Sequence, residues 1–219
     1  LPGRATMYKL KMDGTSEPWA SGFRNPNGMG VFGGDLFVTD NEGAWTPTSK
    51  LIHVKQGRFY GHRSNPPGIF QTANNNVQSP PVIWTNWESG AGFTAAHSTG
   101  RSVGNPILLR QGRYAGQFLI PDFPPDYQQN RIFRVFVENI SGELQGVILP
   151  FVKGGTTTGP HRIQEMADGS LAIGMIGSNC CWGARSGMGK GFNMMRPNPE
   201  APVPFEVLAI RSRGPGIFE

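Results

Sequence analysis

Three segments of the sequence look alike, and their repetition restricts the fold more than any other feature. Each segment has a glycine-containing turn, a short apolar strand and a polar turn, and the three lie at residues 34–38, 116–120 and 169–173. Units of this kind, repeated at irregular spacing, are typical of four-stranded sheets arranged around an axis. No helical period lasts for more than about ten residues. The sequence therefore predicts an all-β fold of the β-propeller class.

The composition agrees with many short strands joined by turns. The 31 glycines and 19 prolines supply turn residues, and a hydrophobic content of 37% with 14 phenylalanines argues against disorder. No apolar run reaches the roughly 18 residues of a membrane span. The net charge of +5 is spread along the chain without a basic stripe or a reader motif, so we do not expect a nucleic acid partner.

The predicted organisation is a partial propeller that covers residues 1–219. We interpret residues 1–20 as the closing strands of a preceding blade, 21–62 and 106–158 as blade units, and 159–219 as a blade unit with a C-terminal strand over 205–211. The stretch 63–105 is interpreted as an insertion or loop with one short strand near 82–85. Alternating apolar positions place five residues in the packed layers between the sheets: Leu36, Val38, Leu119, Leu171 and Ile173.

The stretch 21–62 carries the most specific sequence pattern. It contains G-F-R-N-P-N-G at 22–28, G-D-L-F-V-T-D at 34–40 and K-L-I-H-V-K-Q-G-R-F-Y-G-H at 50–62. Together with residues 159–174, 181–183 and 205–211, this pattern resembles the soluble pyrroloquinoline quinone (PQQ)-dependent glucose/sorbosone dehydrogenase family over nearly the whole chain.

The resemblance implies a six-bladed propeller, of which this chain matches the C-terminal half with about three blades. Half a propeller would leave two sheet edges and an open core exposed. We therefore expect the remaining half as further sequence or as a second chain. The start Leu1-Pro2-Gly3-Arg4 is neither an initiator methionine nor a signal peptide, so we expect the chain to begin within a longer sequence.

The resemblance also implies a function. Family members pass hydride from a sugar hydroxyl carbon to PQQ with the help of Ca²⁺, and the electrons then leave to an external acceptor. The expected substrate is a small sugar or polyol, and the expected location is periplasmic or secreted. The family's catalytic histidine belongs to an earlier blade, and neither His62 nor His97 is its equivalent. The alternative is a non-catalytic β-propeller that serves as a binding or assembly module of an extracytoplasmic complex.

The cofactor contacts implied by the resemblance begin at the R-N-P motif. The family's arginine contacts the quinone oxygens, which assigns this role to Arg24 with Asn25 and Asn27 beside it, because a guanidinium fork suits adjacent oxygens. His161 and Arg162 lie where the family places basic residues against the cofactor's carboxylates, with a histidine replacing an arginine. The alternative for Arg24 is a turn that only joins two blades.

Two further groups of residues complete the expected site. The carbonyl groups of Gly43 and Ala44 match the family's Ca²⁺ ligands, and Glu42 and Asp40 could add carboxylates, although solvated turn acids are the alternative. Trp182 could stack on the cofactor, or it could be an aromatic plug between blades. Beside it, Cys180 and Cys181 predict either a disulfide between adjacent residues that stiffens the pocket or two small packing residues.

Overall fold

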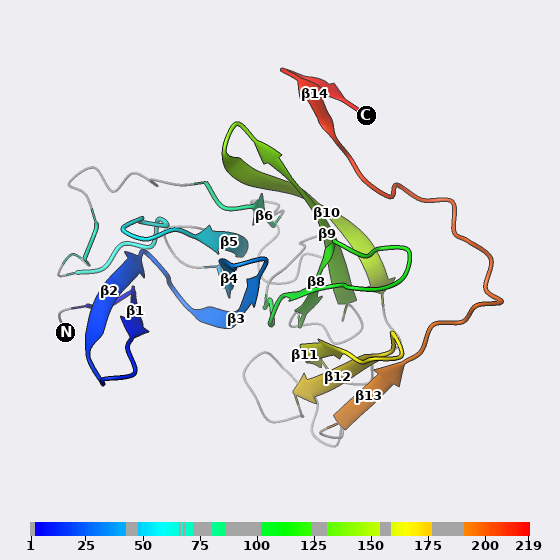
Figure 1. The fold of residues 1–219 in the computed structure, drawn as a ribbon, viewed down its shortest axis with the longest axis horizontal. Helices are drawn as coiled ribbons and strands as arrows, with labels where there is room; N and C mark the ends of the chain where they lie inside the picture. The colour runs from blue at the N-terminus through cyan, green and yellow to red at the C-terminus, as the bar shows by residue number, and fades with distance from the viewer. Residues whose placement is uncertain are drawn as a thin grey trace, which may run out of the picture.

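The computed structural model of the chain is all-β, as the sequence predicts. It describes residues 3–42, 48–65, 67, 69–71, 80–85, 102–123, 131–153, 159–176 and 191–219, and every regular element within them is a β-strand. The strands form antiparallel sheets, three of which stand around the middle of the molecule as blades of a propeller that does not close (Figure 1). Among the described residues, no helix is long and apolar enough to cross a membrane.

The first blade follows the R-N-P motif and is a four-stranded sheet in the order β3-β4-β5-β6. The apolar strand of the repeated segment 34–38 is present as β4 (Asp35–Asp40), β5 (Lys50–Val54) begins the pattern at 50–62, and β6 (Ile83–Trp84) is the short strand expected near 82–85. A separate two-stranded sheet packs beside this blade. The strands are β1 (Thr6–Leu10) and β2 (Ser16–Ser21) of the small sheet, and β3 (Pro26–Phe32), β4 (Asp35–Asp40), β5 (Lys50–Val54) and β6 (Ile83–Trp84) of the blade.

The second and third blades contain four and three described strands, in the orders β10-β9-β8-β7 and β11-β12-β13. The C-terminal hairpin β14-β15 forms a separate two-stranded sheet beside the β9-β10 hairpin (Figure 1), and the backbone N–H of Ser212 donates to Glu138 Oε1 on β9 at 2.6 Å. The bounds are β7 (Ile107–Leu108), β8 (Phe118–Asp122), β9 (Arg131–Ile140), β10 (Glu143–Lys153), β11 (Gly159–Glu165), β12 (Leu171–Ile176), β13 (Gly191–Met195), β14 (Ser212–Gly214) and β15 (Ile217–Phe218).

The prediction of a strand over 205–211 is wrong. These residues belong to no sheet, and the third strand of the last blade is β13 instead. The reason lies in the buried side chain of Arg134, which donates to the carbonyl oxygens of Val207 and Leu208 and to a carboxylate oxygen of Glu206. Gln117 donates to the same carbonyl group of Leu208. Side chains, rather than a neighbouring strand, therefore bind this segment to the second blade.

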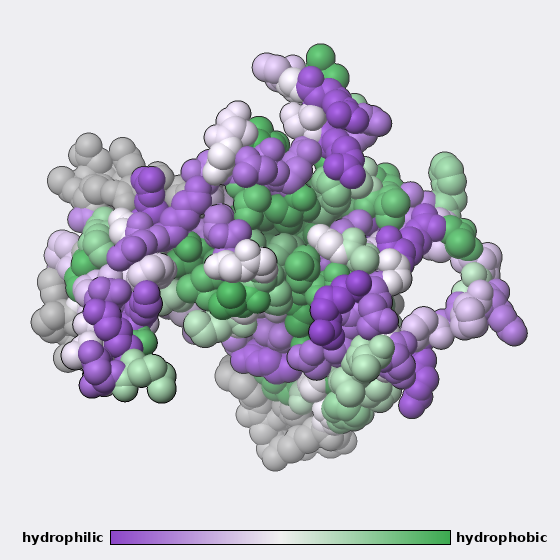
Figure 2. All heavy atoms as spheres, in the orientation of Figure 1, coloured by the Kyte–Doolittle hydropathy of each residue, from purple (hydrophilic) through white to green (hydrophobic). Residues whose placement is uncertain are grey.

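Apolar layers between consecutive sheets hold the blades together. Val38, Leu119, Leu171 and Ile173 are buried as predicted, and the half-buried Leu36 packs against the layer that contains Val38. Figure 2 shows apolar atoms gathered over the middle of the face drawn, where the sheets meet. Strand alternation thus predicts which side chains enter these layers, because the strands turn one set of alternate side chains toward a neighbouring sheet.

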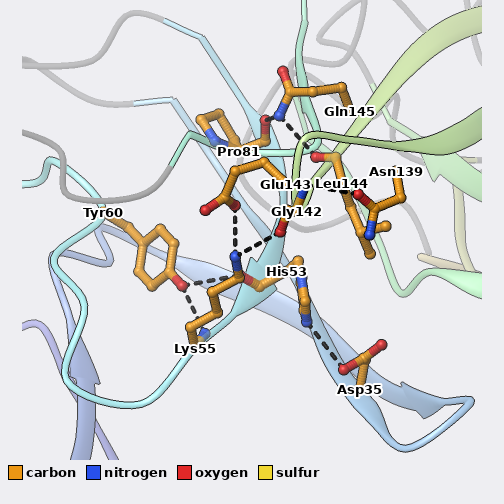
Figure 3. Close-up of polar contacts among 10 residues, drawn as sticks. All are labelled: Asp35, His53, Lys55, Tyr60, Pro81, Asn139, Gly142, Glu143, Leu144 and Gln145. Carbon is orange, nitrogen blue, oxygen red and sulfur yellow. Dashed lines mark hydrogen bonds and ion pairs between the residues drawn. The ribbon is translucent and has the colours of Figure 1, made fainter.

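Polar contacts join the first and second blades at their outer parts (Figure 3). Lys55, directly after β5, donates to Glu143 Oε2 at 2.7 Å and to the carbonyl group of Gly142 at 3.4 Å in the β9-β10 turn. Tyr60 fixes the backbone of Lys55, because its hydroxyl group accepts the Lys55 N–H at 2.7 Å and donates to the carbonyl group of His53. These contacts supplement the apolar layer between the two blades.

Candidate functional site

A buried ion pair holds the R-N-P turn in place. Asp40, the last residue of β4, accepts hydrogen bonds from the backbone N–H groups of Arg24 and Asn25, the latter at 2.7 Å. Its other partner is Lys50 Nζ at 3.4 Å, and the two side chains are 0% and 1% exposed. Burial lowers the pKa of Lys50, and the nearby Asp40 carboxylate opposes this shift. Asp40 is therefore part of the scaffold, and its interpretation as a solvated turn acid is wrong.

The same arrangement recurs in the second blade. Asp122 is the last residue of β8, and Arg131, the first residue of β9, is its direct partner across the two strands. The Arg131 guanidinium lies 3.1 Å from the Asp122 carboxylate, which also accepts the backbone N–H of Ser102. A strand that ends in aspartate, opposite a strand that begins with a cation, is a sequence signal for this pair that the motif analysis missed.

The side chain of Arg24 is exposed, and His62 lies in its electrostatic surroundings. Burial lowers the pKa of His62, while Asp40 acts in the opposite direction and Lys50 and Arg24 add to the lowering. The backbone N–H of His62 donates to the carbonyl group of Gly22, just before the motif. His62 therefore belongs to the surroundings of the R-N-P turn, a role that the sequence analysis did not assign to it.

Asn27 connects the first blade to the third. Its Nδ2 atom lies 2.8 Å from the carbonyl oxygen of Val103 and 2.8 Å from His161 Nε2 on β11. The exposed Arg162 guanidinium reaches back to the carbonyl oxygen of Asn27 at 2.9 Å and lies 2.8 Å from His161 Nδ1. Asn27 thus meets His161 and Arg162, two further residues expected in the site, where β3 and β11 begin. Asn27 lies three positions after Arg24 in the sequence.

Glycines make this close approach of the blades possible. A Cβ atom on Gly104 would lie 2.1 Å from the carbonyl oxygen of His161, and one on Gly28 would lie 2.2 Å from the backbone of Asn105. Between them, Asn105 pairs with the backbone of Ile163 through its side-chain amide, which accepts at 2.9 Å and donates at 3.1 Å. The segment 102–106 therefore lies between β3 and β11 and sets their separation.

His161 is uncharged at neutral pH. Burial, followed by the charge of Arg162, lowers its pKa from 6.5 to about 4. In the unfolded chain the pKa is near the ordinary value, so the unfolded state binds a proton first as the pH falls. The folded state then loses stability between about pH 6.5 and pH 4, whereas above pH 6.5 both states are neutral and His161 adds no pH dependence.

We expect an NMR titration of the His161 ring to give a pKa near 4. The stability of a His161→Gln variant should fall less between pH 6.5 and pH 4 than that of the unaltered protein, because the variant lacks this titrating group. Urea unfolding at a series of pH values measures the difference. A titration midpoint of His161 near the ordinary histidine value would contradict the burial and charge argument.

Of the expected Ca²⁺ ligands at 42–44 and the residues at 180–182, the structure describes only Glu42. Glu42 is half-buried, and its backbone N–H donates to the hydroxyl group of Ser49 at 3.2 Å. Gly43, Ala44, Cys180, Cys181 and Trp182 lie outside the described residues, as does the rest of the turn at 177–183. Within the part of the chain that the structure describes, no three histidine, cysteine or acidic residues are grouped as a metal site.

Comparison with known proteins gives structural neighbours only. No family model and no curated protein matches the sequence. A solved glucose dehydrogenase matches with a TM-score of 0.51 at 12% identity, over 84% of this chain and 47% of its own. A second glucose dehydrogenase has a TM-score of 0.46 at 15% identity (73% of this chain, 39% of its own). The soluble aldose sugar dehydrogenase from Escherichia coli, in its apo form, matches with a TM-score of 0.47 at 12% identity, over 73% of this chain and 44% of its own.

The chain therefore spans less than half the length of each of these proteins. At this level of identity the first match shows a shared fold, which is the blade arrangement described above.

Proposed function

We propose that this chain forms part of a sugar or polyol dehydrogenase that uses PQQ as its cofactor and Ca²⁺ as a bound metal ion. The observation that carries the proposal is the meeting of Asn27, His161 and Arg162 beside the R-N-P turn. The sequence resemblance independently assigns the same residues to cofactor binding. The sugar dehydrogenases among the structural neighbours agree with this reaction class.

The chemistry of the residues suits a quinone that carries carboxylate groups. Arg24 and Arg162 present exposed guanidinium groups, which bind carboxylates and paired oxygens through two parallel hydrogen bonds. Asp40, paired with Lys50, accepts the backbone N–H of Arg24 and holds the turn in place. The turn therefore loses little conformational freedom when a ligand binds. The assignment of Ca²⁺ to Glu42, Gly43 and Ala44 rests on the sequence resemblance.

When bound, PQQ would supply the hydride acceptor. Arg24 would contact the quinone oxygens and stabilise negative charge that develops there. His161 and Arg162 would hold the opposite, carboxylate-bearing part of the cofactor, and Trp182 would lie against its face. The base that removes the sugar's hydroxyl proton would come from an earlier blade, as the sequence resemblance implies, and an external acceptor would receive the electrons. We propose a periplasmic or secreted location on the same grounds.

An Arg24→Ala substitution should weaken PQQ binding by about 10- to 100-fold, because a hydrogen bond from a charged group is lost. The measurement is a titration of the whole protein with PQQ in the presence of Ca²⁺, followed by absorption, together with dye-linked oxidation of sugars. Arg196→Ala is the matched control, since it removes an exposed arginine that follows β13 and lies away from the motif. Failure of the whole protein to bind PQQ would refute the proposal and favour a non-catalytic binding module.

A further inference from the structure

Three separate segments of the backbone meet at the R-N-P turn. The carbonyl group of Ala5 accepts the backbone N–H groups of Gly22 at 2.8 Å and Phe23 at 3.3 Å. The carbonyl group of Gly22 in turn accepts the N–H of His62 at 2.8 Å. Ala5 has a φ of 57°, in the left-handed region that residues other than glycine rarely adopt. The N-terminal turn is therefore held against the motif, and Arg4 directly precedes the residue that anchors it.

The charges around the His62 ring are not balanced. Burial is the largest cause of its lowered pKa, and Asp40 opposes the shift. Lys50, Arg24 and Arg4 lower the pKa further. Asp40 is already paired with Lys50. Arg4 and Arg24 are exposed, and neither forms an ion pair within the part of the chain that the structure describes. Two positive charges are therefore left without a counter-charge in the surroundings of the ring.

The His62 ring is also incompletely hydrogen-bonded. Its Nδ1 atom is buried and has no hydrogen-bond partner among the described residues. The ring is neutral at pH 7, because burial and the nearby cations oppose its protonation. An anion close to Arg4 and the ring would accept hydrogen bonds from the guanidinium group. It would also favour the charged form of the ring and so raise the pKa of His62. The unbalanced charges and the neutral ring therefore suit an anionic ligand.

The position of these residues relative to the expected cofactor indicates which anion they suit. The resemblance assigns Arg24 to the quinone oxygens, and His161 and Arg162 to the carboxylates of the cofactor. Hydride passes from the sugar to the quinone, so the substrate lies at the quinone end. Arg4 and His62 belong to that end, because their backbone contacts join them to the motif that contains Arg24. Their charge therefore acts on the substrate rather than on the cofactor's carboxylates.

We propose that Arg4 and His62 bind an anionic group of the sugar, so that the substrate is a uronic acid or a sugar phosphate rather than a neutral sugar. Arg4 donates hydrogen bonds to the carboxylate or phosphate oxygens, and His62 takes up a proton when the anion is bound. The reaction of this substrate rests on the proposed function, whereas anion binding by the protein without cofactor does not. The resemblance assigns neither residue to a ligand.

The first test follows the His62 ring of the whole protein, without cofactor, by NMR over a series of pH values. Glucose, glucuronate, glucose 6-phosphate or inorganic sulfate is added. We expect an anionic sugar to raise the pKa of His62 and glucose to leave it unchanged. The anionic sugar that binds more tightly identifies the preferred group as carboxylate or phosphate. Absence of a shift with both anionic sugars would overturn the proposal. Sulfate binding as tight as that of the sugars would show an adventitious ion only and overturn it as well.

An Arg4→Ala variant should weaken binding of the anionic sugar about tenfold, because a hydrogen bond from a charged group is lost. Arg58→Ala is the matched control. Arg58 is also an exposed arginine and lies four positions before His62, but it is not among the charges that act on the pKa of the ring. This control should bind the anionic sugar as the unaltered protein does. Equal weakening by both variants would indicate a general effect of net charge and overturn the proposal.

The whole protein with PQQ and Ca²⁺ separates this inference from the proposed function. Its kcat/KM for the anionic sugar should exceed that for glucose, and Arg4→Ala should lower this ratio about tenfold. Binding of anionic sugars by a protein that does not bind PQQ supports the anion site and refutes the proposed function. PQQ-dependent oxidation of glucose, with a ratio that Arg4→Ala leaves unchanged, does the reverse.

Discussion

An Asp40→Ala substitution should lower the free energy of unfolding by about 3–5 kcal/mol. The loss is large because Lys50 would remain buried without a counter-charge, with a side chain that is 1% exposed. In addition, the backbone N–H groups of Arg24 and Asn25 would lose their acceptor. Urea unfolding followed by tryptophan fluorescence measures the change.

The matched control is Asp35→Ala, at the other end of the same strand. The Asp35 side chain is 54% exposed and pairs with His53, so its removal should cost less than about 1 kcal/mol. An Asp40→Leu, Lys50→Met double variant should regain much of the stability, since neither buried charge is then left alone. Equal stability losses for Asp40→Ala and Asp35→Ala would contradict the burial argument.

A Gly104→Ala substitution should cost about 1–3 kcal/mol and disrupt the contact between Asn27 and His161. The added methyl group would lie 2.1 Å from the carbonyl oxygen of His161 and 2.7 Å from the ring of Pro121, and neither neighbour is the end of a flexible side chain. Relief of the clash requires β11 to move away from the segment 102–106. Unfolding measurements give the stability, and the NMR signals of His161 report on the contact.

Gly174→Ala serves as the control for this substitution. A Cβ at Gly174 would lie 3.6 Å from the Arg162 Cβ, which is ordinary contact, and its backbone lies outside the left-handed region. Alanine there should be neutral or stabilising by about 0.5–1 kcal/mol. If Gly104→Ala left the His161 signals unchanged, the close approach would not be what sets the separation of the blades.

Much of the fold could be predicted because each strand alternates and is bounded by turn residues. The apolar positions Val38, Leu119 and Ile173 are buried as their alternation predicts, since each lies in an apolar layer between two neighbouring sheets. The segment 205–211 also has strand-like composition. Its carbonyl groups, however, bind Arg134 from a different blade, and a local pattern does not contain that contact.

The candidate site shows the same division between local and distant contacts. The turn at Arg24 and Asn25 is evident from its own sequence, but its support by Asp40 depends on a strand 15 residues away along the chain. The contact of Asn27 with His161 joins residues 134 positions apart. The fit of Gly104 against His161 does not follow from spacing either, because it depends on how two blades pack.

The ion pairs of Asp40 with Lys50 and Asp122 with Arg131 also bear on how each blade selects its strand register during folding. In both pairs the two residues lie directly opposite each other on neighbouring strands. A slip by one residue would turn the cation toward the other face of the sheet and leave the aspartate buried without a counter-charge. A misaligned blade would therefore be several kcal/mol less stable than the native one, even where its apolar contacts were equally good. Each pair thus penalises incorrect strand pairing, and the repetition of the pair gives two adjacent blades this protection independently.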